Sequence, residues 1–403
     1  MKIIRILIIG SCINLASCGN RYSSAPQLKK VAPPTVEVSQ VESTLPCWNL
    51  NTSLSTDFFK EAVDSMQFIS LETTDASLLG VIDQVQKVGN KLIVVDTYKA
   101  QKILVFDMNG KFLYTIGTKG EGPGEYTSLN HVVITPQTVS ILDGLTWKYI
   151  RYDLKGNVLY EHHFPQSVPS TLMQLDNNTF IGSHTGYFSD NPYQLTWIND
   201  QNSILNTALP FRNPHGEPAG ILQYTLDGSL LFYHNLCDTI YQITDTEIIP
   251  KYRLGLYEPE EVNAFLKRTS EMTDKEYNKA LFDKSSTIVN YHSLVECTDF
   301  WYVEYQRGNL AYLSIVNKKE GKSRNYIQTD LSKKKCYVPF VIHNANDNWL
   351  MTSISDQFYA VLDESMREDF INQIKSEENR NMLRNYDIEN KNPIICLFHL
   401  KKI

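Results

Sequence analysis

Two stretches decide the fold of this chain: KILVFDMNGKFLYTIG at residues 102–117 and KYIRYDLKGNVLYEHHF at residues 148–164. Each holds two strand-length apolar segments around a short turn. In each turn an aspartate and a glycine stand three residues apart, at Asp107/Gly110 and Asp153/Gly156. An aspartate can accept hydrogen bonds from the turn backbone, and glycine can adopt the positive φ that such a turn needs. Both stretches therefore predict β-hairpins built on one plan.

The two hairpins belong to a repeat, because their aspartates are 46 residues apart. Two further steps of 46 reach Asn199 and Asp245, and the next equivalent, Asn317, lies 72 residues further on, after an inserted segment. Each unit offers four short apolar segments, and a period in the forties with four strands per unit is typical of β-propeller blades. One more step reaches Asp363, which we interpret as coincidence. The strand PIICLFHL at residues 393–400 is the better third strand of the last unit.

We therefore predict an all-β fold, a six-bladed β-propeller of four-stranded antiparallel blades over residues 47–403. The early strand MQFISLET, from Met66, has no hairpin partner of its own. We expect it to complete the last blade, since a closed ring leaves no open sheet edge. Two insertions, at about residues 258–284 and 364–386, have the charge and apolar spacing of short surface helices.

The glycine-rich stretch GTKGEGPGEYTSLNH, residues 117–131, raises the question of a phosphate site. A dinucleotide fingerprint needs GxGxxG followed by a helix, whereas Pro123 interrupts this stretch and strand signals follow it. We predict instead a crossover from the outermost strand of blade one to the innermost strand of blade two, where glycines permit sharp turns.

The first seventeen residues predict an export signal, with Lys2 and Arg5 ahead of an apolar run too short to span a membrane. The segment LASC, ending at Cys18, resembles the lipobox of bacterial lipoproteins, which implies lipidation of Cys18 after cleavage. An ordinary secretory signal with a chance cysteine is the alternative. Residues 18–46 contain four prolines and no apolar period, which predicts an extended tether between the lipid and the folded part.

The composition argues against some classes of partner. Removal of Lys2 and Arg5 from 38 basic residues leaves 36 against 45 acidic ones, a net charge of −9, so we expect no nucleic-acid binding. Five cysteines follow Cys18 without any CxxC pair, which disfavours a structural zinc site and predicts mainly buried thiols.

Three segments together resemble the six-bladed β-propeller lipoproteins of the Bacteroidales type, which are related to NHL-repeat propellers: LETT at 71–74, KILVFDMNGKFLYTIG, and GEGPGEY at 120–126. The resemblance implies the fold and a location in the cell envelope, as an outer-membrane lipoprotein held to the membrane by its lipid. Surface-exposed relatives usually carry an acidic run behind the lipidated cysteine, whereas Arg21 stands here, so we favour the periplasmic face over the cell surface. The resemblance implies little about activity.

The sequence contains no complete catalytic motif, so the leading hypothesis is a non-enzymatic binding or scaffolding propeller, a monomer that recognises a protein or glycan on one face of the disc. The alternative is an envelope hydrolase or lyase with a metal-assisted site in the central channel, since histidine is a common metal ligand. We expect no cofactor, with calcium or zinc left open. The candidate residues of the channel or face are His131, His234, His292, His343, Glu125 and Tyr126.

Overall fold

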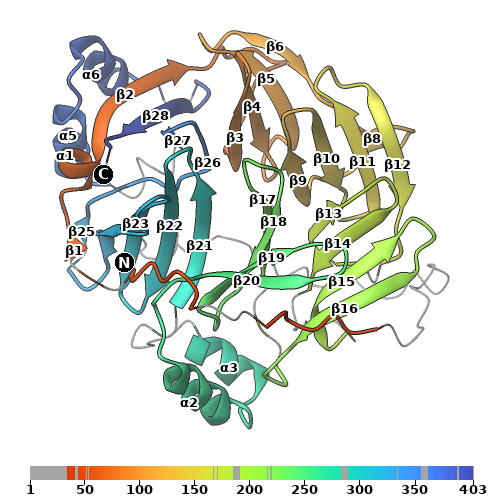
Figure 1. The fold of residues 1–403 in the computed structure, drawn as a ribbon. Helices are drawn as coiled ribbons and strands as arrows, with labels where there is room; N and C mark the ends of the chain where they lie inside the picture. The colour runs from red at the N-terminus through yellow and green to blue at the C-terminus, as the bar shows by residue number, and fades with distance from the viewer. Residues whose placement is uncertain are drawn as a thin grey trace.

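The computed structural model shows six β-sheets arranged as the blades of a ring (Figure 1). It describes residues 34–40, 44–50, 52, 54–166, 168–169, 171–184, 191–215, 217, 220–281, 283, 289–333, 335–354, 362–387 and 390–402. Every blade has a four-stranded antiparallel core, and one blade carries two additional short strands. The predicted six-bladed propeller is thereby confirmed.

The first three blades follow one another without interruption, each with its strands in chain order. Blade 1 contains β3 (Gln84–Val88), β4 (Lys91–Asp96), β5 (Lys102–Asp107) and β6 (Phe112–Thr115). Blade 2 contains β9 (His131–Ile134), β10 (Thr138–Leu142), β11 (Lys148–Asp153) and β12 (Val158–His163). Blade 3 contains β13 (Thr171–Gln174), β14 (Thr179–Ser183), β15 (Tyr193–Asn199) and β16 (Ile204–Pro210).

The next two blades keep this order, and the second of them is the one with additions. Blade 4 contains β17 (Ile221–Tyr224), β18 (Leu230–Tyr233), β19 (Thr239–Ile243) and β20 (Ile248–Arg253). Blade 5 contains β21 (Val289–Glu296), β22 (Phe300–Arg307), β23 (Leu310–Asn317) and β24 (Ser323–Asp330). Its outer strand β24 also pairs with β1 (Leu54–Ser55) and β25 (Lys335–Cys336).

Blade 6 closes the ring as the sequence predicts. It takes β26 (Asn344–Asn346), β27 (Trp349–Ile354) and β28 (Ile394–Leu400) from the end of the chain and β2 (Val63–Ser70) from its beginning. The strand β2 runs antiparallel to β28, with Phe68 opposite Cys396. Because β28 is the third strand, the Asp363 match is a coincidence, as predicted: Asp363 caps a helix, and its carboxylate accepts a hydrogen bond from the Met366 N–H.

The first strand of each blade faces the centre of the ring. Neighbouring first strands contact one another, as β26 does with β3, β9 with β13, and β21 with β26. The fourth strands form the outer rim. One face of the disc therefore carries the crossovers between blades and the turns between second and third strands, which we call the crossover face. The other face carries the hairpin turns after the first and third strands, which we call the hairpin face.

The repeated turns on the hairpin face have one geometry. Asp107 accepts hydrogen bonds from the N–H groups of Asn109 at 2.8 Å and Lys111 at 2.9 Å. One blade later, Asp153 accepts in the same way from the N–H groups of Lys155 and Asn157. Gly110 has a φ of +81°, and a Cβ there would lie 2.0 Å from the Ser70 carbonyl oxygen, so only glycine fits. The amide oxygens of Asn199 and Asn317 replace the aspartates in blades 3 and 5.

The predicted insertions form helices outside the ring (Figure 1). Between blades 4 and 5 lie α2 (Pro259–Thr269) and α3 (Asp274–Leu281), and between β27 and β28 lie α5 (Glu364–Asn372) and α6 (Glu377–Arg384). A short helix, α1 (Phe58–Ala62), precedes β2. Within the described residues, no helix has the length and apolar character needed to cross a membrane.

The hydrophobic core is divided into six clusters, one at each interface between neighbouring blades. Between blades 3 and 4, for example, Trp197 and Phe232 are both fully buried. Full burial of one large apolar side chain stabilises the fold by roughly 1.5–3 kcal/mol. Adhesion between adjacent blades therefore holds the ring together, and the helices extend two of these interfaces.

The described part of the N-terminal segment lies on the outer rim. Thr35 bridges to Thr207 of blade 3, Val38 to Ile248 of blade 4, and β1 pairs with β24 of blade 5, all in parallel orientation. The Val36 N–H donates to the Thr207 carbonyl at 2.8 Å. The described residues 34–40 and 44–46 cover the edge strands of the ring. We call the described residues between 34 and 55 the strap.

Candidate functional site

The structure places two of the candidate histidines on the crossover face, in different blades. The Leu172 N–H of blade 3 donates to Nδ1 of His131 at 3.4 Å, and Nε2 of His343 lies 3.0 Å from the Ser353 hydroxyl. Burial lowers the pKa of His131 and of His343 to about 4. Both imidazoles are therefore neutral at physiological pH and are bound by side chains or backbone of their own surroundings.

The other two candidate histidines differ in their surroundings. His234 follows β18 and is only 4 % exposed, next to the buried carboxylate of Glu217. His292 lies in β21 at a break in the pairing register, and its side chain is outside the described part of the structure. Among the described residues, no group of three or more histidine, cysteine or acidic side chains is placed to hold a metal ion. The channel metal site remains a hypothesis.

Glu125 and Tyr126 lie in the predicted crossover between β6 and β9, which is confirmed. They form β8 (Glu125–Tyr126), which pairs with β7 (Thr118–Lys119). Glu125 accepts a hydrogen bond from the Gly122 N–H at 2.9 Å, and the buried Tyr126 hydroxyl donates to the Gln101 carbonyl at 3.0 Å. Both side chains are engaged within the crossover and the blade 1–blade 2 core. Cys18 lies outside the described residues.

The crossover glycines serve close packing. Gly124 has a φ of +69°, and a Cβ there would lie 2.6 Å from Cγ2 of Val158. Its N–H donates to Glu161 at 2.5 Å, and its carbonyl accepts from the Tyr152 hydroxyl at 2.9 Å. The Lys148 ammonium donates to the Gly122 carbonyl at 3.0 Å. The backbone groups that a phosphate would need are thus directed at blade 2.

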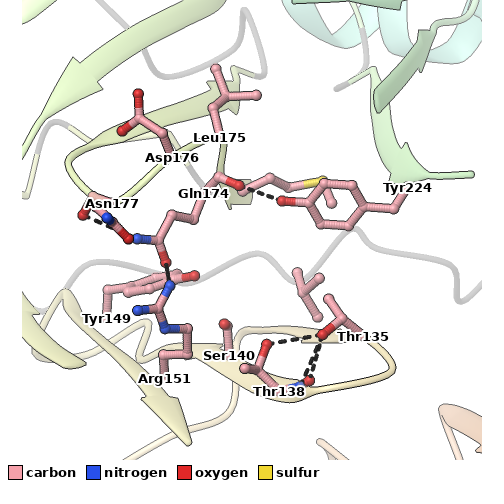
Figure 2. A pocket seen from close by; sticks show the side chains of 12 residues that line it. Thr135, Thr138, Ser140, Tyr149, Arg151, Gln174, Leu175, Asp176, Asn177 and Tyr224 are labelled. Atoms are coloured by element: carbon pink, nitrogen blue, oxygen red, sulfur yellow. Dashed lines mark hydrogen bonds between the residues drawn. The ribbon is translucent and has the colours of Figure 1, made fainter. Parts of the chain in front are cut away.

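A polar pocket lies on the hairpin face, where blades 2, 3 and 4 meet (Figure 2). It encloses about 270 Å³. Blade 2 contributes side chains from β9, β10 and β11, blade 3 contributes the turn after β13, and blade 4 contributes Tyr224 at the end of β17. We call it the blade 2–3 pocket.

Arg151, on β11, is one of the residues that line this pocket, and its side chain reaches toward Gln174 (Figure 2). Its Nη1 donates to Oε1 of Gln174 at 2.7 Å, and Gln174 Nε2 donates to the Asn177 carbonyl at 3.2 Å (Figure 2). The Tyr224 hydroxyl donates to the Gln174 carbonyl. Nε of Arg151 is buried and makes no hydrogen bond to any described residue. A buried donor without a partner costs about 1–3 kcal/mol, so the site favours an added acceptor.

The wall opposite Gln174 is formed by hydroxyl groups. The hydroxyls of Thr135 and Thr138 lie 2.9 Å apart, beside Ser140 (Figure 2). Tyr149, also on β11, is buried, and burial raises the pKa of its hydroxyl. Asp176 is the acidic residue of the lining. Its carboxylate accepts hydrogen bonds from the N–H groups of Asn178 and Thr179. The bond from Asn178 is the main cause that lowers the pKa of this carboxylate. The pocket thus presents hydroxyls, amides, one cation and the Asp176 carboxylate, together with the ring of Tyr224.

The repeat contains a signal for this pocket that the sequence analysis did not use. In the aligned third strands KILVFD and KYIRYD, Arg151 occupies the position of Val105, and Tyr149 that of Ile103. A cation that replaces an apolar residue inside a strand indicates a local polar environment. The partners Gln174 and Tyr224 come from other blades, and only the folded ring reveals them.

A second, larger cavity of about 810 Å³ lies at the rim, between α1, β2 and α5. Apolar groups of Phe59, Met66 and Phe370 line it together with the lysines Lys60, Lys375 and Lys401. Lys401 and Lys375 donate to backbone carbonyls of Lys60 and Asp64. These hydrogen bonds join the C-terminal part of the chain to the N-terminal segment beside the closing strand β2.

Comparison with solved structures agrees with this fold. A candidate exported protein from Bacteroides fragilis is 18 % identical, with a TM-score of 0.68, over 89 % of this chain and 100 % of the other. A member of the duf4221 family from Bacteroides vulgatus is 10 % identical, with a TM-score of 0.49, over 85 % and 98 %. Virginiamycin B lyase from Staphylococcus aureus is 15 % identical, with a TM-score of 0.40, over 72 % and 81 %. The first of these supports the fold, and none of them informs activity.

No curated protein matches this chain. One family does, described as "Domain of unknown function (DUF4934)", and its match runs over residues 45–399. That range begins in the strap and ends in the third strand of blade 6, so it spans all six blades. The chain therefore belongs to the DUF4934 family.

Proposed function

We propose that this protein is a binding propeller of the cell envelope that recognises an acidic sugar of a glycan in the blade 2–3 pocket. The observation that carries the proposal is the buried Nε of Arg151, which has no hydrogen-bond partner in the described structure. A carboxylate is the acceptor that best suits a guanidinium, since the pair forms short, charge-assisted hydrogen bonds.

The remaining lining supports a sugar over a protein loop. A volume of about 270 Å³ is near the lower limit of small-ligand pockets, which start at roughly 300 Å³. The hydroxyls of Thr135, Thr138 and Ser140 can exchange hydrogen bonds with sugar hydroxyls, because each hydroxyl both donates and accepts. The ring of the partly exposed Tyr224 offers apolar surface with a polar end.

The envelope location is part of the proposal. Its support is the lipobox-like LASC segment ending at Cys18 and the similarity of the fold to a candidate exported protein. A lipid on Cys18 would hold the chain at a membrane, and the periplasmic face is favoured because Arg21 stands where an acidic run would indicate surface display.

Binding of defined oligosaccharides to the purified protein tests the proposal. We expect oligogalacturonate or oligoglucuronate to bind, measured by calorimetry, and the matching neutral oligosaccharides to bind at least tenfold more weakly. Arg151→Gln keeps a polar side chain but removes the cation. It should weaken uronate binding at least tenfold, which corresponds to about 1.4 kcal/mol.

The matched control is Arg268→Gln, which removes an exposed arginine on α2. It should leave uronate binding unchanged, because α2 lies outside the ring (Figure 1). Equal binding of uronates by the Arg151→Gln variant and the wild type would refute the role of Arg151. Absence of any uronate binding by the wild type would refute the proposed ligand class.

A further inference from the structure

A second site is suggested where blade 4 departs from the pattern of blades 1 and 2. In those blades an aspartate ends the second strand and binds the incoming crossover: Asp96 accepts from the N–H groups of Gly80 and Val81, and Asp143 accepts from the Thr127 N–H. These buried carboxylates fix the crossover to the blade that it enters. The same position in blade 4 carries His234.

The carboxylate in blade 4 comes instead from the crossover itself. Glu217 is fully buried; its Oε1 accepts from the Arg212 N–H at 2.8 Å, and its Oε2 lies 3.6 Å from Nδ1 of His234 and 3.5 Å from Nη2 of Arg212. His234 is stacked on Phe232, with ring centroids 5.5 Å apart. The Nδ1 atom of His234 is buried and makes no hydrogen bond to a described residue, and the Glu217 carboxylate lies 3.6 Å from it. Glu217 thus orients a buried imidazole.

Cys237 lies three residues after His234, in the same turn. Its thiol lies 3.6 Å from the Tyr241 hydroxyl and is close enough to the His234 side chain for the imidazole to act on the pKa of the thiol. The intervening Leu236 is buried and has a φ of +64°, a left-handed conformation that is unfavourable for leucine. The Arg212 guanidinium donates to the Leu236 carbonyl at 2.6 Å and so helps to hold this turn. Cys237 itself is partly exposed, in a turn of the crossover face.

The charges of this cluster favour an ion pair. Burial alone would lower the pKa of His234, but the contacts with Cys237 and Glu217 outweigh it and raise that pKa. Burial alone would raise the pKa of Cys237, but His234 outweighs it and lowers that pKa to about 7. The titratable and charged groups that face the thiol and the imidazole are Arg212 and Glu217 from the crossover and Tyr241 from β19.

We propose that Cys237 is a nucleophilic thiolate site, with His234 as its proton donor and acceptor and Glu217 as the residue that positions His234, and that it reacts with small organic disulfides. The thiolate attacks one sulfur of the disulfide and forms a mixed disulfide with Cys237. The S–S bond of the reagent breaks, and the released thiolate takes the proton from the His234 imidazolium. The Cys237 sulfur is oxidised and the leaving sulfur is reduced, so no other oxidant is needed.

The test is the rate at which bis(2-hydroxyethyl) disulfide modifies Cys237 in the purified protein, followed by peptide mass mapping at pH 7 and pH 9.5. The ratio of the two rates cancels differences in access. A thiol with a pKa near 7 is half ionised at pH 7, so its rate should rise only about twofold, whereas that of an ordinary thiol should rise about 30-fold. A cysteine in a short unstructured peptide is the ordinary reference.

His234→Gln should raise the rate ratio of Cys237 to at least that of the peptide reference, because burial alone raises the pKa of the thiol. Glu217→Gln should raise the ratio above the wild-type value, because the imidazolium loses its buried counter-charge. Cys336→Ser, at a thiol with no imidazole partner among its described contacts, is the matched control and should leave the ratio unchanged. A wild-type ratio above about tenfold would overturn the proposal, and that measurement needs no variant to fold.

Discussion

Asp143 offers a direct test of how the crossovers are held. Its carboxylate is fully buried and accepts hydrogen bonds from the Thr127 N–H at 2.6 Å, the Ser128 hydroxyl at 2.9 Å, and the N–H groups of Leu145 at 2.9 Å and Thr146 at 3.2 Å. These bonds join the 117–131 crossover to the turn between β10 and β11. The replacement Asp143→Asn keeps the size of the side chain, but it removes the charge and turns an NH₂ group toward donors.

The expected cost can be worked out in two ways. Hydrogen bonds to a charged group contribute about 1.5–3 kcal/mol each against about 1 for neutral ones, and the amide retains only one acceptor oxygen, so a loss of about 2–4 kcal/mol follows. Burial alone would raise the pKa of Asp143, but these bonds outweigh it and lower that pKa to about 2 from 3.8. A shift of that size corresponds to about 2.4 kcal/mol.

Guanidinium unfolding, followed by tryptophan fluorescence, measures the difference. We expect Asp143→Asn to lose about 2–4 kcal/mol at pH 7. Because the folded pKa is lowered, this contribution is present above pH 3.8 and is lost as the pH falls toward 2. The two proteins should therefore converge in stability in acid. Asp245→Asn, at an exposed turn of blade 4, is the matched control and should change little. A loss below 0.5 kcal/mol for Asp143→Asn (about the scatter of a surface substitution) would refute the reasoning.

Two further predictions concern other buried groups. Burial raises the pKa of Glu304 to about 7, so its neutral form stabilises the fold fully below pH 4.5, and this stability is lost as the pH rises through about 7. Glu304→Gln should therefore be more stable than the wild type at pH 8, by at most about 3 kcal/mol, and should lose this advantage at pH 5 in urea unfolding; an equal effect at both pH values would contradict it. In the strap, Trp48 is buried and its ring lies 5.0 Å from that of Tyr252 and 5.8 Å from that of Trp301, so Trp48→Ala should cost about 3–5 kcal/mol in the same assay. Leu54→Ala, at a half-exposed position of β1, is its control, and equal losses for the two variants would argue against a strap anchored by Trp48.

The repeat could be predicted from sequence because its turns are local. The Asp107 and Asp153 side chains bond to N–H groups two and four residues away, so the residues that define the turn lie within a few positions of one another. The closing strand was also predictable, since β2 is an apolar strand without a hairpin partner. The strap was not, because residues 34–40 bond to blades 3 and 4 through backbone groups, which leave no pattern in the side chains.

For the candidate residues, too, the sequence predicts the position along a strand, but not the contacts with residues of other elements. The sequence predicts candidate histidines near first strands, and the structure places His131 and His343 there. Whether a side chain at such a position is charged depends on burial, and burial is a property of the assembled ring. The partners that distinguish Arg151 and His234, Gln174 and Glu217 respectively, are 23 and 17 residues away, in other elements.

A repeat supplies its own reference for recognising such sites. In a ring whose blades share one plan, each position has counterparts that show what structure alone requires there. Val105 shows that the third strand needs no cation where Arg151 stands, and Asp96 and Asp143 show that a carboxylate suffices where His234 stands. Stability explains the shared residue at each position, but it does not explain the replacement, because Arg151 has a donor left without a partner and the turn of His234 holds a leucine in a left-handed conformation. Residues that depart from the shared plan at a cost to stability are the ones expected to serve binding or chemistry.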